Sequence, residues 1–205
     1  ILINVNSENG GSITLNAARD ITTGNLSVAA KQNGAPIALT STTGSINTGT
    51  IDTTGASAAG KVTLQADSGI KASTLTGVST NGNGSNVTLS TTKGDVNIGD
   101  VLVGGKLQGG NLEFTNKTGN ITTGKLTTSY NGSSAGVSTN KGGAVNLNAQ
   151  GNITTNAIGS SGTQDGGSIT FKSGGAIDTT AGIINAIGGN NGGSISLEAA
   201  TNIST

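Results

Sequence analysis

The chain has 205 residues, with ten basic and ten acidic side chains and no Cys, His, Met or Trp. Without His or Cys it lacks the Ser-His and Cys-His nucleophile pairs, the usual nitrogen and sulfur ligands of zinc, and any disulfide framework. A net charge of zero without a basic stripe argues against electrostatic capture of nucleic acid or of an anionic membrane. Gly, Thr, Asn and Ser make up 114 of the 205 residues, which is typical of either a disordered tract or a repeat.

The beginning of the chain has a strand-like pattern, and Ile3 and Val5 fit the last strand of an earlier coil. No charged segment or cleavage site of a signal peptide precedes them. Stretches without glycine reach at most twelve residues, as from Ser12 to Thr23, which is too short for a helix that spans a membrane. We therefore expect a processed or excised segment, open at both ends, with no membrane span.

One phrase recurs along the chain. It reads GGSITLNAARDITTGNL from Gly10 and GGNLEFTNKTGNITTGKL from Gly109, with further copies from Gly142, Gly166 and Gly192. Alignment of eight copies, the last one truncated, gives four apolar columns. The first holds Ile13, Ile37, Val62, Val87, Leu112, Val145, Ile169 and Ile195. The second holds Leu15, Leu39, Leu64, Leu89, Phe114, Leu147, Phe171 and Leu197. The third holds Ile21, Ile46, Ile70, Val96, Ile121, Ile153, Ile177 and Ile203, and the fourth holds Leu26, Ile51, Leu75, Val101, Leu126, Ile158 and Ile183.

The pattern within each copy predicts strands. Apolar and polar residues alternate with period two across the first two columns, as in a strand with one buried face, and the glycines exclude long helices. A single copy cannot bury its apolar face, whereas stacked copies turn the columns into continuous internal ladders. We therefore predict one all-β domain over residues 1–205, a right-handed parallel β-helix of about eight coils with about 25 residues per coil.

The spacing between Leu112 and Val145 is 33 residues, wider than between any other neighbouring copies. The extra residues predict an inserted corner loop at 129–141. Its Tyr130, Asn131 and Lys141 are candidate partner-binding residues, because loops that leave a rigid solenoid commonly carry recognition. A Gly- and Ser-rich loop is equally typical of a tolerated insertion.

Parallel β-helices also include polysaccharide-acting enzymes, whose chemistry needs carboxylates that converge from adjacent coils. Asp20 and Asp95 share a column but lie three coils apart, roughly 14 Å at the spacing of β-strands. No dyad on neighbouring coils emerges, and the G-G-x-G-x-D spacing of calcium-binding β-rolls is missing. We expect no catalytic residue, no cofactor and no intrinsic metal.

Other polar columns have structural explanations. Asp100 and Lys125 share a column on neighbouring coils and predict an exposed ion pair. An outward threonine column could form an ice-binding array, although Thr is also favoured in any exposed strand; it holds Thr14, Thr63, Thr88 and Thr170. A second threonine column is expected to bond to the backbone at a corner; it holds Thr23, Thr48, Thr123, Thr155, Thr179 and Thr205.

Triplets of the type Asn-x-Ser/Thr are frequent, and glycosylation at them would require an outward side chain. They begin at Asn25, Asn86, Asn116, Asn120, Asn131, Asn152 and Asn202.

The GG-S-I-T-L and N-I-T-T-G-x-L phrases resemble the filamentous-haemagglutinin repeat region of bacterial two-partner-secretion exoproteins, and the resemblance covers the whole chain. It implies export through a dedicated outer-membrane transporter and a role in adhesion, aggregation or biofilm formation. The Asn-Pro-rich signature of the family's secretion domain is missing, since Pro36 is the only proline. The segment therefore corresponds to shaft, and no functional residue of the family can be placed on it.

The expected function is that of a structural shaft in a secreted, cell-surface or extracellular filamentous adhesin, where it spaces or presents a binding region. The expected partners are flanking coils of the parent chain, identical segments joined end to end, or glycans or proteins of a host surface or matrix, and not nucleic acid. Two alternatives stay open: the repeating body of a self-assembling extracellular filament, and a polysaccharide-acting enzyme.

Overall fold

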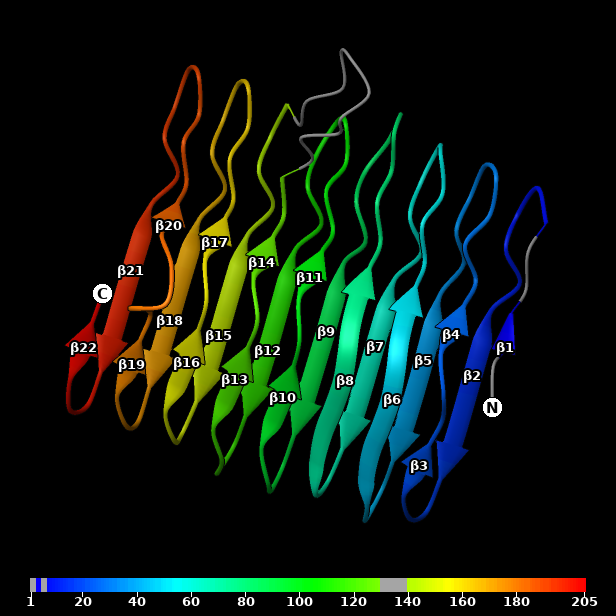
Figure 1. The fold of residues 1–205 in the computed structure, drawn as a ribbon, viewed down its shortest axis with the longest axis horizontal. Helices are drawn as coiled ribbons and strands as arrows, with labels where there is room; N and C mark the ends of the chain where they lie inside the picture. Colours follow the sequence, from blue (N-terminus) through cyan, green and yellow to red (C-terminus); the bar gives the residue numbers. More distant parts are fainter. Residues whose placement is uncertain (1–2, 5–6, 130–139) are drawn as a thin grey trace.

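The computed structural model describes residues 3–4, 7–129 and 140–205, and all regular secondary structure in these ranges is β-strand. Figure 1 shows a flat stack of coils with the two chain ends at opposite ends of the stack. Each complete coil contributes one five-residue strand to one sheet and one or two strands to a second sheet, and the core lies between the two. The right-handed parallel β-helix predicted from the repeat is confirmed.

The first sheet has eight strands, one from each copy of the repeat. In spatial order they are β2 (Ile13–Ala17), β5 (Ile37–Ser41), β7 (Val62–Ala66), β9 (Val87–Thr91), β12 (Leu112–Asn116), β15 (Val145–Ala149), β18 (Ile169–Ser173) and β21 (Ile195–Ala199).

The second sheet has fourteen strands, and the chain completes about seven turns in all. One part of it contains β3 (Ile21–Thr22), β6 (Ser45–Asp52), β8 (Gly69–Thr76), β10 (Val96–Ile98), β13 (Ile121–Thr123), β16 (Ile153–Thr155), β19 (Ile177–Asp178) and β22 (Ile203–Ser204). The other part contains β1 (Ile3–Asn4), β4 (Leu26–Ser27), β11 (Val101–Leu102), β14 (Leu126–Thr127), β17 (Ile158–Gly159) and β20 (Ile184–Asn185). The long strands β6 and β8 belong to both parts.

The register places equivalent residues of successive copies directly beside each other. Ile121 pairs with Ile153, and Phe114 pairs with Leu147, although an insertion separates these copies in sequence. Parallel pairing in identical register gives every inward side chain an aliphatic or aromatic neighbour above and below. The apolar columns are therefore the internal ladders that the sequence predicts.

Burial follows the predicted ladder closely. The structure buries Ile13, Ile21, Leu26, Val87, Leu89, Leu112, Phe114, Ile121, Leu126, Val145, Leu147, Ile153, Ile169, Phe171 and Ile177. Leu15, in the first rung, is half-buried. Ile195 and Ile203 in the last rung are each 48% exposed, because a ladder residue there has a neighbour on one side only.

One assignment in the fourth column is wrong. Ile158 pairs with Ile184, and Ile183 is 77% exposed. A tight turn precedes this strand, in which the Gly182 N–H donates to the Thr179 carbonyl and the Asp178 carboxylate accepts from the Thr180 N–H. The turn lengthens the corner, so the inward position moves one residue further along the chain.

The second threonine column points into the stack. Thr48, Thr123, Thr155 and Thr179 are buried, and Thr123 Oγ1 donates to the Gly124 carbonyl as expected of a corner residue. Thr155 Oγ1 is buried without a hydrogen-bond partner in the described residues. The predicted bonding is therefore present at some positions of this column and missing at one.

On one side of the stack, each coil extends beyond the two sheets as a thin glycine-rich loop (Figure 1). We call these loops the fin; they comprise residues 28–35, 53–60, 77–85, 103–110, 160–167 and 186–193. A backbone hydrogen bond closes the base of each loop, as from the Gly60 N–H to the Thr53 carbonyl. Successive loops pair through isolated parallel bridges such as Asn33 with Ala58, so the fin repeats with the coils.

Candidate functional site

Two carboxylates that directly precede the third apolar column accept hydrogen bonds from backbone N–H groups of the next coil. Asp20 Oδ1 accepts from the Ser45 N–H at 2.7 Å and from the Ser45 hydroxyl at 2.8 Å, and these bonds lower the pKa of Asp20. Asp95, three rungs away in the same column as predicted, accepts from the Asn120 N–H at 2.8 Å. Both side chains hold the next coil, and they do not face each other as an acid/base pair would.

The predicted ion pair between Asp100 and Lys125 does not form. Asp100 Oδ1 instead accepts from the backbone N–H of Lys125 at 2.8 Å, because the corner places this N–H beside the carboxylate of the coil before. Ion pairs link neighbouring coils elsewhere: Lys31 with Glu8 at 3.3 Å, Lys93 with Asp67 at 3.1 Å, Lys141 with Asp165 at 3.4 Å, and Lys172 with Glu198 at 3.5 Å. All of them are at least partly exposed, so each contributes little.

A side-chain ladder that the sequence analysis missed runs along three corners. In it, the Oδ1 atom of an Asp or Asn accepts from the backbone N–H one coil further on. The acceptors are Asp20, Asn25, Asn86, Asp95, Asp100, Asn111, Asn120 and Asn152. Each stands directly before the first, third or fourth apolar column, and that recurrence is the sequence signal that could have identified it.

The same ladder constrains the Asn-x-Ser/Thr triplets. Asn116 is buried and its Nδ2 donates to the Gly94 and Asn120 carbonyls, so its amide nitrogen is not accessible. Asn120 Nδ2 donates to Asp95 Oδ1 at 3.1 Å. Asn25, Asn86 and Asn152 are exposed, with their Oδ1 atoms bound to the next coil. Asn202 is also exposed, and Asn131 lies outside the described residues.

The inserted corner loop is described only at its two ends. Of the candidate partner-binding residues, Tyr130 and Asn131 lie outside the described residues, and Lys141 lies between two loops of the fin. Lys141 pairs through its backbone with Gln108 on one side and Asp165 on the other. Asp165 accepts from Asn191 Nδ2 at 2.9 Å, and this bond, with a smaller effect of Lys141, lowers the pKa of Asp165. Lys141 is therefore held by the same coil-to-coil pairing as the loops on either side of it.

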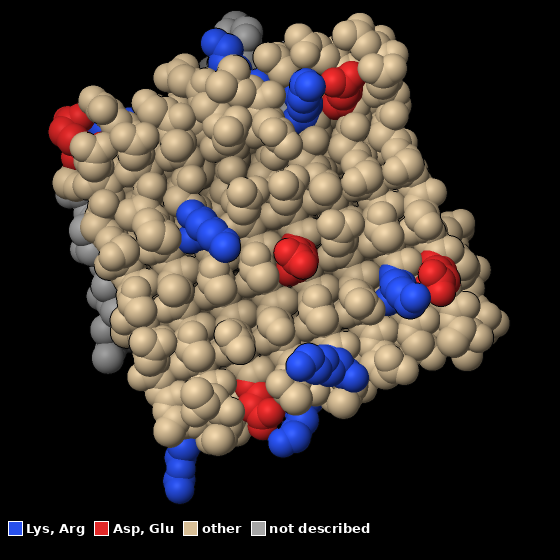
Figure 2. Space-filling view, turned by 180° about the vertical axis from the view of Figure 1, so that it is seen from behind, with Lys and Arg blue, Asp and Glu red and all other residues tan. Residues whose placement is uncertain are grey.

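The outward threonines Thr14, Thr63, Thr88 and Thr170 lie on the outer face of the eight-stranded sheet, where they are exposed or half-buried. The same row contains Ala38, Glu113, Asn146 and Ser196, so it is not a uniform threonine array. Figure 2 shows a broad face of the molecule on which charged side chains are few and dispersed.

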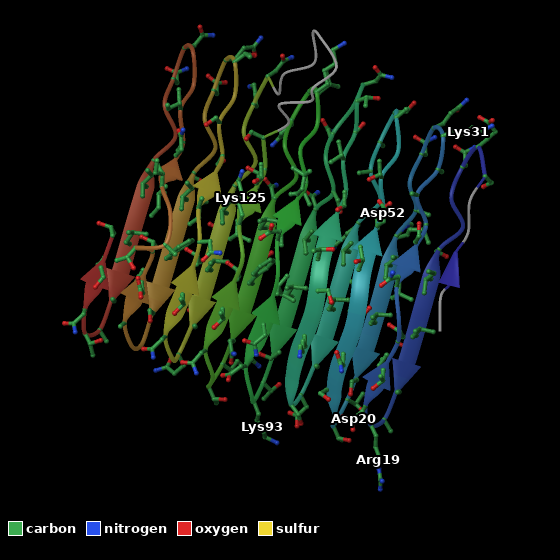
Figure 3. All side chains as sticks on the ribbon, in the orientation of Figure 1. Arg19, Asp20, Lys31, Asp52, Lys93 and Lys125 are labelled. Carbon is green, nitrogen blue, oxygen red and sulfur yellow. The ribbon has the colours of Figure 1, made fainter. Side chains whose placement is uncertain are left out.

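A groove of about 700 Å³ lies where the fin leaves the second sheet, and it crosses five coils. Its walls contain the residues before and after each fourth-column residue. The row before consists of Thr74, Asp100, Lys125, Ala157 and Ile183. The row after consists of Thr76, Leu102, Thr127, Gly159 and Asn185, and Ser129 and Ser161 lie at the base of the fin. Figure 3 shows Lys125 at the end of the strands from which the fin departs.

Comparisons of this chain with protein-family models, with curated proteins and with solved structures find no match. Within the ranges 3–4, 7–129 and 140–205, no group of three or more Asp and Glu residues is placed to hold a metal ion. The same ranges contain no helix with the length and apolar character needed to cross a membrane. The groove combines a hollow with varied polar groups, namely hydroxyls, a carboxylate, an amine and an amide.

Proposed function

We propose that this chain is a shaft segment of a secreted, surface-exposed bacterial filamentous adhesin, in which it spaces or presents a binding region. The observation that supports this function most is the unbroken register of the eight strands of the first sheet, in which every rung repeats the one before. At about 4.8 Å per rung, eight rungs span roughly 34 Å, and further copies extend the rod without changing its cross-section. Such a fold is suited to bridging distance.

The chemistry of the surface agrees with this role. The carboxylates Asp20, Asp95 and Asp100 bind the backbone of the next coil, so they serve the rod and are not arranged for acid/base work. We therefore assign a non-enzymatic role. The absence of Cys suits a chain that crosses an outer-membrane pore unfolded, because no disulfide can form before export.

Deletion of a whole coil tests the shaft. Removal of residues 37–61, a coil that does not line the groove, from the parent protein joins Pro36 to Val62 in register, and we expect the variant to reach the cell surface, with a rod shorter by about 4.8 Å. Removal of residues 37–48 is the matched control, because half a coil destroys the register. Surface exposure is measured on intact cells with an antibody against this segment. Adhesion to a receptor-coated surface is measured in parallel.

Three results would contradict the proposal. Retention of the segment inside the cells would exclude the secreted location. Loss of adhesion on deletion of the single coil, with surface exposure unchanged, would mean that the segment itself is the binding region. Turnover of a polysaccharide that Asp95→Asn abolishes would favour the enzymatic alternative.

A second candidate function is the repeating body of a self-assembling extracellular filament. Each rung pairs with the next in the same parallel register, and the pairing that joins β18 to β21 would equally join the last rung of one copy to the first rung of another. Sedimentation velocity of the isolated segment between micromolar and millimolar concentration tests this candidate. A monomer throughout this range would exclude end-to-end assembly, whereas oligomers that Ile195→Lys disperses would support it.

A further inference from the structure

The groove beside the fin has an unusual floor. Most glycines of this chain are required by close packing: a Cβ on Gly34 or Gly84 would lie 1.9 Å from a carbonyl oxygen of the next coil. Gly159 is different, because the nearest atom to its Cβ would be Ser129 Oγ at 3.7 Å, an ordinary contact distance. Its φ is not positive either. Within the described residues, neither packing nor backbone conformation requires glycine at 159, and its lack of a side chain keeps the groove open.

The groove is also long and electrically neutral. Five coils at about 4.8 Å spacing give it a length of roughly 19 Å along the rod. Asp100 and Lys125 contribute one charge of each sign, and no other charged residue among those described lines it. A polyanion such as a sulfated glycan or a nucleic acid would gain no net attraction here.

Polar groups in the groove are available for a ligand. The hydroxyls of Thr76 and Thr127 make no hydrogen bond within the described ranges, and Asp100 uses only Oδ1 internally. Asn185 Oδ1 accepts from Ser161 Oγ and from the Ile187 N–H, which leaves its Nδ2 free to donate. The groove thus offers donors and acceptors at intervals that the coil spacing sets.

Apolar surface lies between these polar groups. Leu102 is 36% exposed and Ile183 is 77% exposed, one on each side of the open floor at Gly159. Alternating hydroxyl partners and aliphatic patches match the alternating hydroxyl groups and C–H faces of a pyranose chain. They match an apolar helix poorly, since such a helix would leave the threonine hydroxyls and the Asp100 carboxylate unpaired.

We propose that this groove is a binding site for a linear, uncharged glycan that lies along the rod axis. Asp100 Oδ2 accepts from sugar hydroxyls, Asn185 Nδ2 donates to them, and Leu102 packs on a sugar face two coils before the open floor at Gly159. This inference goes beyond the shaft function and does not depend on it. A glycan site on the rod is compatible with a principal binding region in this segment and with one elsewhere in the parent protein.

The variant Gly159→Val tests the site without disturbing the rod. Valine suits a strand, and its Cβ meets no atom closer than 3.7 Å, so the variant should fold with unchanged or raised thermal stability while its side chain fills the floor. Thr170→Val, on the outer face of the other sheet, is the matched control. Binding is measured by NMR titration of the chain with cellohexaose, with the linear para-lacto-N-hexaose and with a heparin hexasaccharide.

We expect at least one of the two neutral hexasaccharides to bind, with shifts at Leu102, Thr127 and Asn185. The cellohexaose arm represents matrix-type glucans, and the para-lacto-N-hexaose arm represents glycans of animal cell surfaces. Gly159→Val should weaken binding by about tenfold or more, while Thr170→Val leaves it unchanged. Asp100→Asn keeps the bond to the Lys125 N–H and should weaken binding less.

Three results would overturn the proposal. They are no binding of either neutral hexasaccharide, equal binding by the wild type and Gly159→Val, and preferred binding of the heparin hexasaccharide. A wild-type dimer that Gly159→Val dissociates would assign the groove to a second copy of the chain instead. None of these results bears on the whole-coil deletion, so the failure of this inference is distinguishable from the failure of the shaft function.

Discussion

The stack and the fin are two regions of the same repeat, and they are held together differently. In the stack, side chains such as Ile121, Phe114 and Leu147 fill the space between two sheets and are fully buried. In the fin, backbones approach so closely that a Cβ on Gly55 would lie 2.2 Å from the Gly34 nitrogen of the preceding loop and 2.3 Å from the Ala58 carbonyl oxygen of its own loop. The stack therefore depends on the size of its side chains, and the fin depends on their absence.

The largest expected effect comes from a charge placed in the stack. Ile121→Asp puts a carboxylate beside Ile153 and Val96 without a partner, which should cost several kcal/mol of unfolding free energy and melt the adjacent coils. Circular dichroism during thermal unfolding measures the loss. Thr122→Asp, at the exposed neighbouring position, is the control and should unfold close to the wild type. A folded Ile121→Asp rod would show that the ladder is not the stabilising element.

The next effect compares two glycines. Gly55→Ala forces its Cβ against the Gly34 nitrogen and the Ala58 carbonyl, and overpacking of this kind typically costs about 1–3 kcal/mol. Gly159→Ala, with open space at its Cβ, should be neutral or stabilising. Chemical denaturation of both variants gives the two free energies. Equal effects would mean that backbone packing in the fin is looser than the contact distances indicate.

A smaller effect is expected from the corner ladder. Asn120→Ala removes the acceptor of the Asn152 N–H and the donor to Asp95, which should cost about 0.5–1.5 kcal/mol because the freed groups can bind water. Asn120→Asp keeps the acceptor and serves as the control for the main-chain bond. Hydrogen exchange at the Asn152 amide provides a local readout, and unchanged protection in Asn120→Ala would contradict the role of this bond.

The smallest effect is on acid stability. Hydrogen bonds from Ser45, Asn191 and Thr180 lower the pKa values of Asp20, Asp165 and Asp178 below their ordinary value. These carboxylates bind protons more weakly in the folded than in the unfolded chain. Their contribution to stability is therefore present above the ordinary Asp pKa of about 4, and it is lost as the pH falls through the lowered folded-state values.

The melting temperature, followed from pH 7 to pH 2, checks this expectation. The contribution of these three carboxylates to the melting temperature should be constant from pH 7 to about pH 4. Below pH 4 the melting temperature should fall modestly, because all three lie at the surface. Asp165→Asn retains an oxygen that accepts from Asn191 and should reduce the fall. A melting temperature that rises on acidification below pH 4 would show that the sign is wrong.

The recurring apolar columns were sufficient to predict the fold, since a repeat with period-two alternation can bury its face only against its own copies. Ile121 beside Ile153, Phe114 beside Leu147 and the buried second threonine column all follow from that constraint. Ile183 was misplaced because a turn at Thr180–Gly182 changes the length of one corner, and a corner leaves no periodic signal. The Asp100–Lys125 pair failed for a similar reason, since the sequence places two residues in one column without showing where their side chains lie.

The sequence by itself determined the path of the chain, the register and the buried residues, because these depend on a hydrophobic pattern that is repeated eight times. Only the tertiary structure decided which carboxylates hold the backbone, which glycines separate two backbones, and which one opens a groove. Those properties depend on distances between atoms of different coils. A Cβ on Gly159 would lie 3.7 Å from Ser129 Oγ, whereas a Cβ on Gly55 would lie 2.2 Å from the Gly34 nitrogen. Gly55 and Gly159, which the sequence does not distinguish, therefore have opposite roles in the folded rod.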